Sequence, residues 1–330
     1  MKTRLRWIPA TLAILVLPLA LAVAAYARAA EGSFERALKV TGPVDLTVTT
    51  GSGNIDIKTG GAGSVHVRGL IRVNGNWHLS AEEAERRVRA LESNPPIEQT
   101  GNSIRIGHIE DPALRRHVSI SYELVVPVET RVTSDTGSGD QSIIGVRGPV
   151  KADTGSGNVK VSRVGDVVRA QTGSGDIQLD AVKAQVYAET GSGNIRATGV
   201  DGGFVGTTGS GDVRLEQTAA GPVTIETGSG NADISGVQGS LRAHTGSGNL
   251  TADGQPSGPW KLDAGSGNIT LRLPAQAAFD LHAGTGSGEV STSHEITVQG
   301  KLSRHELRGK VRGGGVLVEV STGSGDIHIE

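Results

Sequence analysis

The chain has 330 residues, no cysteine, 49 glycines and 3 % aromatic residues. This composition argues against a thick globular core and favours a thin, turn-rich β protein without disulfides. The formal net charge is −2 at pH 7, and it becomes −6 once residues 1–29 are left out. A mildly acidic protein is poorly suited to bind nucleic acid or to coat an anionic membrane by charge.

The first 29 residues carry the features of a secretion signal. Residues 2–6 read Lys-Thr-Arg-Leu-Arg, residues 7–27 carry no charge, and residues 27–29 form an A-x-A pattern. We therefore expect a signal peptide over residues 1–29 and an exported protein that is periplasmic, on the outer surface or extracellular. The alternative is an uncleaved anchor, because the uncharged run is long enough to span a bilayer. Membrane contact is expected only through this segment.

Residues 30–135 predict an N-terminal β cap region that contains one short helix. Alternating apolar and polar residues predict its strands, which are expected at 38–40, 44–48, 55–57, 65–68, 104–106, 118–126 and 129–133. Near residues 80–92 the alternation stops. Ser80 and Glu83 form a capping-box pattern, and the apolar residues that follow have helical spacing. This helix is expected to cover the first repeats as a flap.

Eleven copies of Gly-Ser-Gly recur along the chain, and they dominate its architecture. Ten are preceded by Thr and ten are followed by Asn or Asp, with Ala264 and Glu289 as the exceptions. From Gly137 to Gly209 the spacing is a constant 18 residues. A short fixed period predicts an all-β fold, a parallel β-solenoid (β-helix) of about 18-residue coils. We expect regular repeats over 136–293 and closing coils over 294–330.

Each repeat contains two short alternating runs separated by two turns, which predicts two strands per repeat with one buried face. Aligned repeats give four inward columns. The two columns after the Gly-Ser-Gly turn are Val159, Ile177, Ile195, Val213, Ala232, Leu250 and Ile269, then Ile143, Val161, Leu179, Ala197, Leu215, Ile234, Ala252 and Leu271. The two columns after the other turn are Val150, Val168, Val186, Phe204, Val223, Leu241, Trp260 and Phe279, then Ala152, Ala170, Ala188, Gly206, Ile225, Ala243, Leu262 and Leu281.

The residues after each Gly-Ser-Gly are expected to stack in one column at the turns. They predict a structural turn ladder, in which their side chains form hydrogen bonds between successive repeats. Its members are Asp140, Asn158, Asp176, Asn194, Asp212, Asn231, Asn249 and Asn268. Two Asp residues stacked one strand apart would repel by roughly 1 kcal/mol in a water-like dielectric. Alternation of the first six residues separates the carboxylates and lets each Asn amide donate to a neighbouring Asp. Such a ladder requires no metal.

Three specific functions are alternatives to a purely structural role for the repeats: calcium binding, ice binding and polysaccharide chemistry. Calcium in a β-roll would use Asp140, Asp176 and Asp212, although half of the turn residues are Asn. Ice binding would use the row of Thr residues before the glycines, which lies at a turn and has no flat T-x-T face. We predict no cofactor, and no metal site beyond these weak calcium candidates.

A polysaccharide-active enzyme is the third hypothesis, because some β-helices carry such activity. It would need convergent carboxylates in a cleft. The outward acids in related positions are Asp153, Glu189, Glu226 and Asp263, and Tyr187 is the one obvious outward aromatic. Charged residues on the wet face of a strand are usually only solvated. We therefore predict a non-enzymatic protein with no catalytic or cofactor-binding residues.

Four segments resemble a bacterial putative-adhesin family of β-strand-repeat proteins, a cell-envelope family with a domain of unknown function. Residues 38–57 resemble its opening strands, and residues 80–91 its single helix. Residues 118–132, with Tyr122-Glu-Leu-Val-Val-Pro, resemble the strand before its repeats, and residues 309–329 its last coil. The resemblance implies no catalytic or ligand residues. The expected function is that of an adhesin or surface-interaction module, whose partners are envelope or host-surface macromolecules. A periplasmic structural or envelope-stress-linked protein is the alternative.

Overall fold

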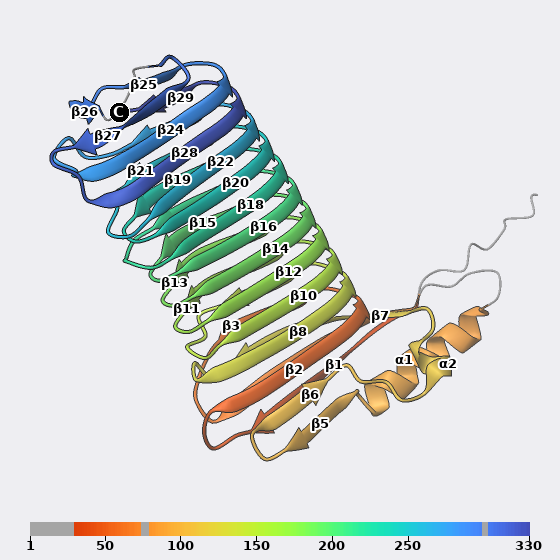
Figure 1. Cartoon of the computed structure of the whole chain (residues 1–330). Helices are drawn as coiled ribbons and strands as arrows, with labels where there is room; N and C mark the ends of the chain where they lie inside the picture. Colours follow the sequence, from red (N-terminus) through yellow and green to blue (C-terminus); the bar gives the residue numbers. More distant parts are fainter. Residues whose placement is uncertain (1–29, 74–78, 299–302) are drawn as a thin grey trace, which may run out of the picture.

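The computed structural model describes residues 30–73, 79–298 and 303–330. The expected signal peptide at 1–29 therefore lies outside the described residues. Strands make up most of the described chain, and they stack side by side into an elongated body with the helices at the N-terminal end (Figure 1). Within the described part, no helix is long and apolar enough to span a membrane.

Two long sheets, here called sheet A and sheet B, form the body. In spatial order, the 14 strands of sheet A are β1 (Ala30–Lys39), β4 (Ser64–Val73), β7 (Val118–Val126), β3 (Ile55–Thr59), β9 (Gln141–Ile144), β11 (Val159–Val164), β13 (Ile177–Val182), β15 (Ile195–Val200), β17 (Val213–Gln217), β19 (Ala232–Val237), β21 (Leu250–Gly254), β23 (Ile269–Arg272), β29 (Ile327–Ile329) and β25 (Val290–Thr292).

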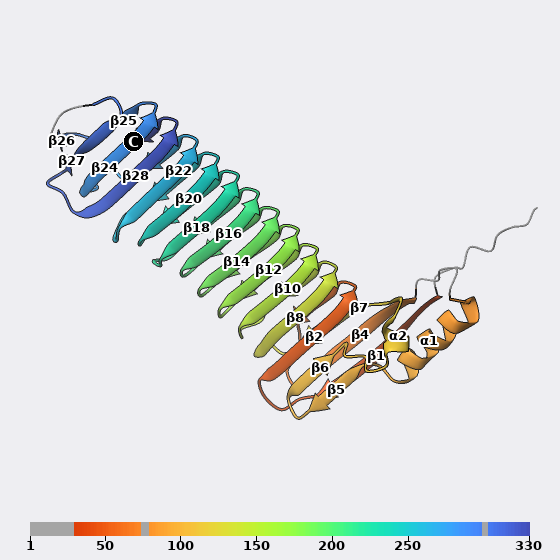
Figure 2. The ribbon, with the colours of Figure 1, turned by 45° about the vertical axis from the view of Figure 1, so that its right-hand side comes forward.

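The 15 strands of sheet B, in spatial order, are β26 (Ile296–Val298), β27 (Glu306–Val311), β24 (Phe279–Ser287), β28 (Val316–Ser324), β22 (Trp260–Ser266), β20 (Leu241–Ser247), β18 (Val223–Ser229), β16 (Phe204–Ser210), β14 (Val186–Ser192), β12 (Val168–Ser174), β10 (Val150–Ser156), β8 (Thr130–Ser138), β2 (Val44–Ser52), β6 (Ser103–Ile106) and β5 (Ile97–Thr100). Figure 2 shows the sheet B strands as a regular series along the body.

The chain alternates between the two sheets at every Gly-Ser-Gly turn. A repeat is defined here as one strand of sheet B, the turn and the next strand of sheet A. Successive repeats pair in parallel, with Val150 opposite Val168 in sheet B and Val159 opposite Ile177 in sheet A. Both pairs are 18 residues apart, so equivalent residues of successive repeats lie side by side. The predicted nearly all-β fold with parallel strand pairing is confirmed.

The inner faces of both sheets form one apolar core, and all four predicted inward columns are buried in it. Two further columns were not predicted. One contains valines that end the sheet A strands, such as Val164 and Val182. The other contains the Thr residues that precede Gly-Ser-Gly, such as Thr172 and Thr190. The regular repeats, such as β12–β13 and β14–β15, therefore bury six positions rather than four.

The first repeat lies within the predicted N-terminal cap region. Strands β2 and β3 stack directly on β8 and β9, with Ser52 opposite Ser138 and Ile55 opposite Gln141. The intervening chain folds around the N-terminal end of the stack. There β1 pairs antiparallel with β4 and β5 pairs antiparallel with β6, so each sheet changes from parallel to antiparallel pairing at this end. Antiparallel edge strands limit further parallel stacking.

Helix α1 (Ala81–Ser93) confirms the predicted helix and its cap. The Glu83 N–H donates to Ser80 Oγ at 3.2 Å, and Val88 and Leu91 are buried. The helix packs on β1 beside Gly32, where an added Cβ would lie 2.3 Å from Val88 Cγ1. The structure also contains α2 (Pro112–Arg115), a single turn that the expectation of only one helix missed. Its four residues are too few to show a helical period.

The terminal repeat, which was expected to close the stack, lies inside it. Strand β28 pairs in parallel with both β22 and β24, and β29 lies between β23 and β25. Because every repeat carries the same turn, a later repeat can pair in register with an earlier one. At the C-terminal end of sheet B, β27 instead pairs antiparallel with β24 and β26 pairs antiparallel with β27.

Candidate functional site

The residues after Gly-Ser-Gly form one continuous hydrogen-bonded column along the body. From the second repeat onward, the backbone N–H of this residue donates to the side-chain Oδ1 of the equivalent residue in the adjacent repeat of the stack. The distances are 2.8 Å for Asn158 to Asp140 and 2.9 Å for Asp176 to Asn158. All eight predicted ladder residues belong to this column. A side chain thus accepts the turn N–H of the next repeat, which water would otherwise have to satisfy.

The column extends beyond the eight predicted residues at both ends. It begins at Asn54, whose Oδ1 accepts from the Asp140 N–H at 3.0 Å. It continues through Asp326 and finishes at Glu289, whose N–H donates to Asp326 Oδ1 at 2.9 Å. Strand β25, which follows Glu289, is the edge of sheet A, so no later turn N–H needs an acceptor from Glu289. This position explains the one exception to Asn or Asp.

The Asp and Asn side chains in the column have different contacts. Asn158, Asn194 and Asn231 each donate a side-chain N–H to the Asp before them, at 3.2 to 3.3 Å. Each Asp of an alternating pair therefore accepts two hydrogen bonds on the same Oδ1. Among the described residues, no group of three or more His, Asp or Glu has a geometry that could hold a metal ion. The calcium hypothesis for Asp140, Asp176 and Asp212 gains no geometric support.

The Thr row forms a second, internal ladder, which the sequence pattern alone does not indicate. Its hydroxyls donate to glycine carbonyls of the preceding repeat; Thr172 Oγ1 donates to Gly157 O at 2.9 Å, and Thr190 Oγ1 to Gly175 O at 3.0 Å. Thr172 and Thr190 are each 2 % exposed. A buried row cannot present an ice-binding face, so the structure contradicts that hypothesis.

A cavity with a volume of about 760 Å³ lies on the outer side of sheet A near the N-terminal end. The Arg68 side chain on β4 links the two neighbouring strands there. Its guanidinium pairs with Glu35 on β1 at 3.5 Å and with Glu123 on β7 at 3.2 Å. Asp56 and Lys58 also line the cavity, and neither side chain has an ion-pair partner among the described residues. The lining is mainly charged and carries both signs.

A buried tyrosine hydroxyl lies beside a smaller cavity of about 230 Å³. Tyr122 is 1 % exposed, and its Oη has no hydrogen-bond partner within the described chain. Burial raises the pKa of the Tyr122 hydroxyl, because the phenolate would lose its hydration. Arg115 and His108 also line this cavity, which is large enough for water to satisfy the hydroxyl.

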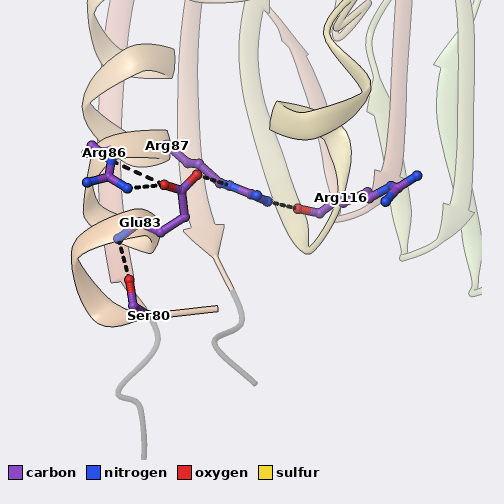
Figure 3. Close-up of polar contacts among 5 residues, drawn as sticks. All are labelled: Ser80, Glu83, Arg86, Arg87 and Arg116. Carbon is purple, nitrogen blue, oxygen red and sulfur yellow. Dashed lines mark hydrogen bonds and ion pairs between the residues drawn. The ribbon is translucent and has the colours of Figure 1, made fainter. Parts of the chain in front are cut away.

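A polar cluster attaches α1 to the loop before β7 (Figure 3). Glu83 accepts from Arg86 Nε at 3.2 Å and from Arg87 Nε at 3.1 Å, and Arg87 Nη1 donates to Arg116 O at 2.8 Å. These hydrogen bonds, from Arg86 first and then Arg87, hold the pKa of the Glu83 carboxyl below its ordinary value of 4.5. The arrangement orients the helix and offers no cleft for chemistry.

The outward carboxylates considered for polysaccharide chemistry lie in one column on the outer face of sheet B. Asp153 pairs with Lys151 at 2.7 Å, and Asp263 pairs with His244 at 2.9 Å. Glu189 and Glu226 lie two strands apart, on either side of β16. None of the five cavities described for the chain is lined by either glutamate. The structure thus does not bring these acids together as a catalytic pair.

The fold and the repeated turns define a class, that of nearly all-β proteins built from in-register strand repeats. Within this class, the family model described as Toastrack DUF4097 matches residues 166–330, which is half of the chain. The chain therefore belongs to the Toastrack DUF4097 family, and the resemblance seen in the sequence is confirmed.

Two solved structures are similar to this chain. A putative adhesin from Bacteroides fragilis is 12 % identical, with 91 % of this chain and 97 % of that chain covered and a TM-score of 0.32. A putative cell adhesion protein from Clostridium sporogenes is also 12 % identical, with 90 % and 99 % covered and a TM-score of 0.22. No curated protein matches the chain.

Proposed function

We propose that the chain is an exported envelope or surface protein that works by binding a macromolecule and not by catalysis. The observation that carries this proposal is the pair of long outer sheet faces, on which side chains of successive repeats align in straight columns. A surface that repeats at the strand spacing of about 4.8 Å suits an extended partner with its own repeat. We infer that the two sheets are walls of a β-solenoid with coils of about 18 residues.

Two features of the sequence support export. The basic residues at 2–6 and the uncharged run at 7–27 precede the A-x-A pattern, and β1 starts directly afterwards at Ala30. A signal peptide could therefore be removed without loss of any described strand. The absence of cysteine removes any dependence on the redox state of the compartment.

Protease shaving of intact cells tests the proposal, with an antibody to this protein and a cytoplasmic protein as the control. Digestion in intact cells places the repeats on the surface and supports a role in adhesion. Protection that is lost when the outer envelope is opened supports the alternative, a periplasmic structural or stress-linked protein. Protection that persists until the inner membrane is lysed overturns export.

A further inference from the structure

One part of the outer face of sheet B differs from the rest of that face. It spans β12, β14 and β16, and its six side chains form two adjacent columns. We call it the Tyr187 patch, and its residues are Arg169, Tyr187, Val205, Gln171, Glu189 and Thr207. Tyr187 is the aromatic residue among the described exposed large hydrophobics, with 38 % of its surface accessible.

Arg169 holds the Tyr187 ring in place. Its guanidinium carbon lies 4.5 Å from the ring centroid, within the range of a cation–π interaction. On the other side, Val205 pairs in register with Tyr187 and adds apolar surface. The ring is thus oriented on a rigid sheet before any partner arrives, which lowers the conformational entropy lost on binding.

The polar column beside the ring has no internal partners. Within the described residues, the side chains of Gln171, Glu189 and Thr207 make no hydrogen bond or ion pair. Farther along the same column, Asp153 and Asp263 are paired internally, whereas Glu226, opposite Thr207, has no ion-pair partner among the described residues. Lys151 binds Asp153 at 2.7 Å, and Asp263 accepts from Ser321 Oγ at 2.6 Å while pairing with His244. The run of free donors and acceptors therefore extends from Gln171 to Glu226 and includes the positions beside the exposed ring.

We propose that the Tyr187 patch binds a neutral, hydroxyl-rich glycan chain, which rests on the proposed function as a surface-binding protein. A sugar ring has an apolar C–H face that packs on an aromatic ring, and hydroxyls at its rim that bond to carboxylates, amides and hydroxyls. The patch presents these groups side by side, with the ring in one column and Gln171, Glu189 and Thr207 in the next.

The charges of the patch favour a neutral ligand. Arg169 and Glu189 balance each other within the patch, and Glu226 lies opposite Thr207 just beyond it. A polyanion would meet the two glutamates, while a basic peptide would meet Arg169. Hydroxyl groups can donate to the carboxylates and accept from the guanidinium without a like-charge contact.

Affinity electrophoresis with polymers cast into a native gel tests this site. The neutral probes are hydroxyethylcellulose, mannan, dextran and laminarin; carboxymethylcellulose is the anionic probe and polylysine the basic one. We expect at least one neutral polymer to retard the protein. Tyr187→Ala should weaken that binding by about tenfold or more, because the apolar platform is lost. Tyr187→Phe keeps the ring and should retain most of it.

Leu317→Ala is the matched control, because Leu317 has the same 38 % exposure on another strand of sheet B; its binding should be unchanged. The proposal is overturned if no neutral polymer retards the protein or if Tyr187→Ala binds as well as the parent. Stronger retardation by carboxymethylcellulose than by hydroxyethylcellulose, or binding of polylysine alone, also overturns it. Protease shaving separates the glycan site from the proposed surface function. If the protein is digested on intact cells but binds no glycan, the glycan site is rejected and the surface function stands. If the protein is protected but binds glycan, only the surface function is rejected.

Discussion

Asn194 makes two hydrogen bonds to a single oxygen of Asp176 in the preceding repeat. Its backbone N–H donates to Asp176 Oδ1 at 2.8 Å, and its side-chain Nδ2 donates to the same atom at 3.2 Å. In turn, Asn194 Oδ1 accepts from the Asp212 N–H at 3.0 Å. The Asn side chain therefore separates two carboxylates while it continues the chain of hydrogen bonds through the turns.

Asn194→Asp should destabilise the protein by about 1 kcal/mol, because the change removes a donor to Asp176 and places three carboxylates in neighbouring turns. The loss should be larger at low ionic strength, where exposed charges are less screened. Urea denaturation at low and high salt measures it.

Asn249→Asp is the matched control for this prediction. The neighbours of Asn249 in the column are Asn231 and Asn268, so the new carboxylate meets no like charge in an adjacent turn. Its stability should change much less than that of Asn194→Asp. Equal losses in the two variants, with no dependence on salt, would reject charge separation as the reason for the alternation.

The first glycine of the turn motif is required because the backbone of the preceding repeat leaves no room for a Cβ. At Gly137 an added Cβ would lie 2.6 Å from Gly51 O, whereas at Gly51, the equivalent glycine of the first repeat, it would meet nothing within 4 Å. Gly137→Ala should therefore cost about 2 kcal/mol or more through backbone displacement, and Gly51→Ala should be nearly neutral. Thermal unfolding of both variants decides; similar melting temperatures would contradict the close-approach explanation.

The four apolar columns could be predicted because each strand is short and alternates with period two between glycine-rich turns. The column of Val164 and Val182 was missed for a definite reason. The residues before them, Arg163 and Ala181, have φ of 54° and 53°, a left-handed conformation that interrupts the alternation. After this break the next residue points inward, although strict alternation from Val161 would place it outside.

Other features could not be read from local pattern at all. The burial of Thr172 depends on a glycine carbonyl of the preceding repeat, which only the stacked geometry supplies. The position of β28 between β22 and β24 depends on a choice among repeats with the same turn motif. The unpaired polar side chains of the Tyr187 patch can be recognised only once the ion pairs and hydrogen bonds of the neighbouring surface residues are known. Sequence periodicity therefore defined the core, and the order of repeats and the surface pairing needed the structure.

Ala264 interrupts the internal Thr ladder and offers a way to strengthen it. It is buried between Thr245 and Thr322, both of which donate to glycine carbonyls. Ala264→Thr should stabilise the protein by about 1 kcal/mol through the equivalent hydrogen bond to Gly248 O. Ala264→Val, which has the same shape without a hydroxyl, should give no such gain. Thermal melts compare the two, and an equal or larger gain for Val would assign the effect to packing alone.

The Glu83 cluster should make helix docking depend on acid pH. The hydrogen bonds from Arg86 and Arg87 keep the folded-state pKa of Glu83 below 4.5, so the unfolded chain binds its proton more readily. The stabilisation is therefore fully present above the unfolded pKa and is lost as pH falls through the lower folded value. Glu83→Gln should unfold at lower urea than the parent at pH 7, and the difference should shrink as pH falls below about 4.5.

Arg89→Gln provides the control for this pH dependence. Arg89 pairs with Glu85 at 3.2 Å on the same helix, with both side chains more than half exposed, and it does not contact Glu83. Its loss should change stability little, because exposed ion pairs contribute about 0–1 kcal/mol. Urea midpoints of the three proteins from pH 3 to 7 make the comparison. A Glu83→Gln difference that stays constant over this range would show that Glu83 acts through packing or capping and not through its charge.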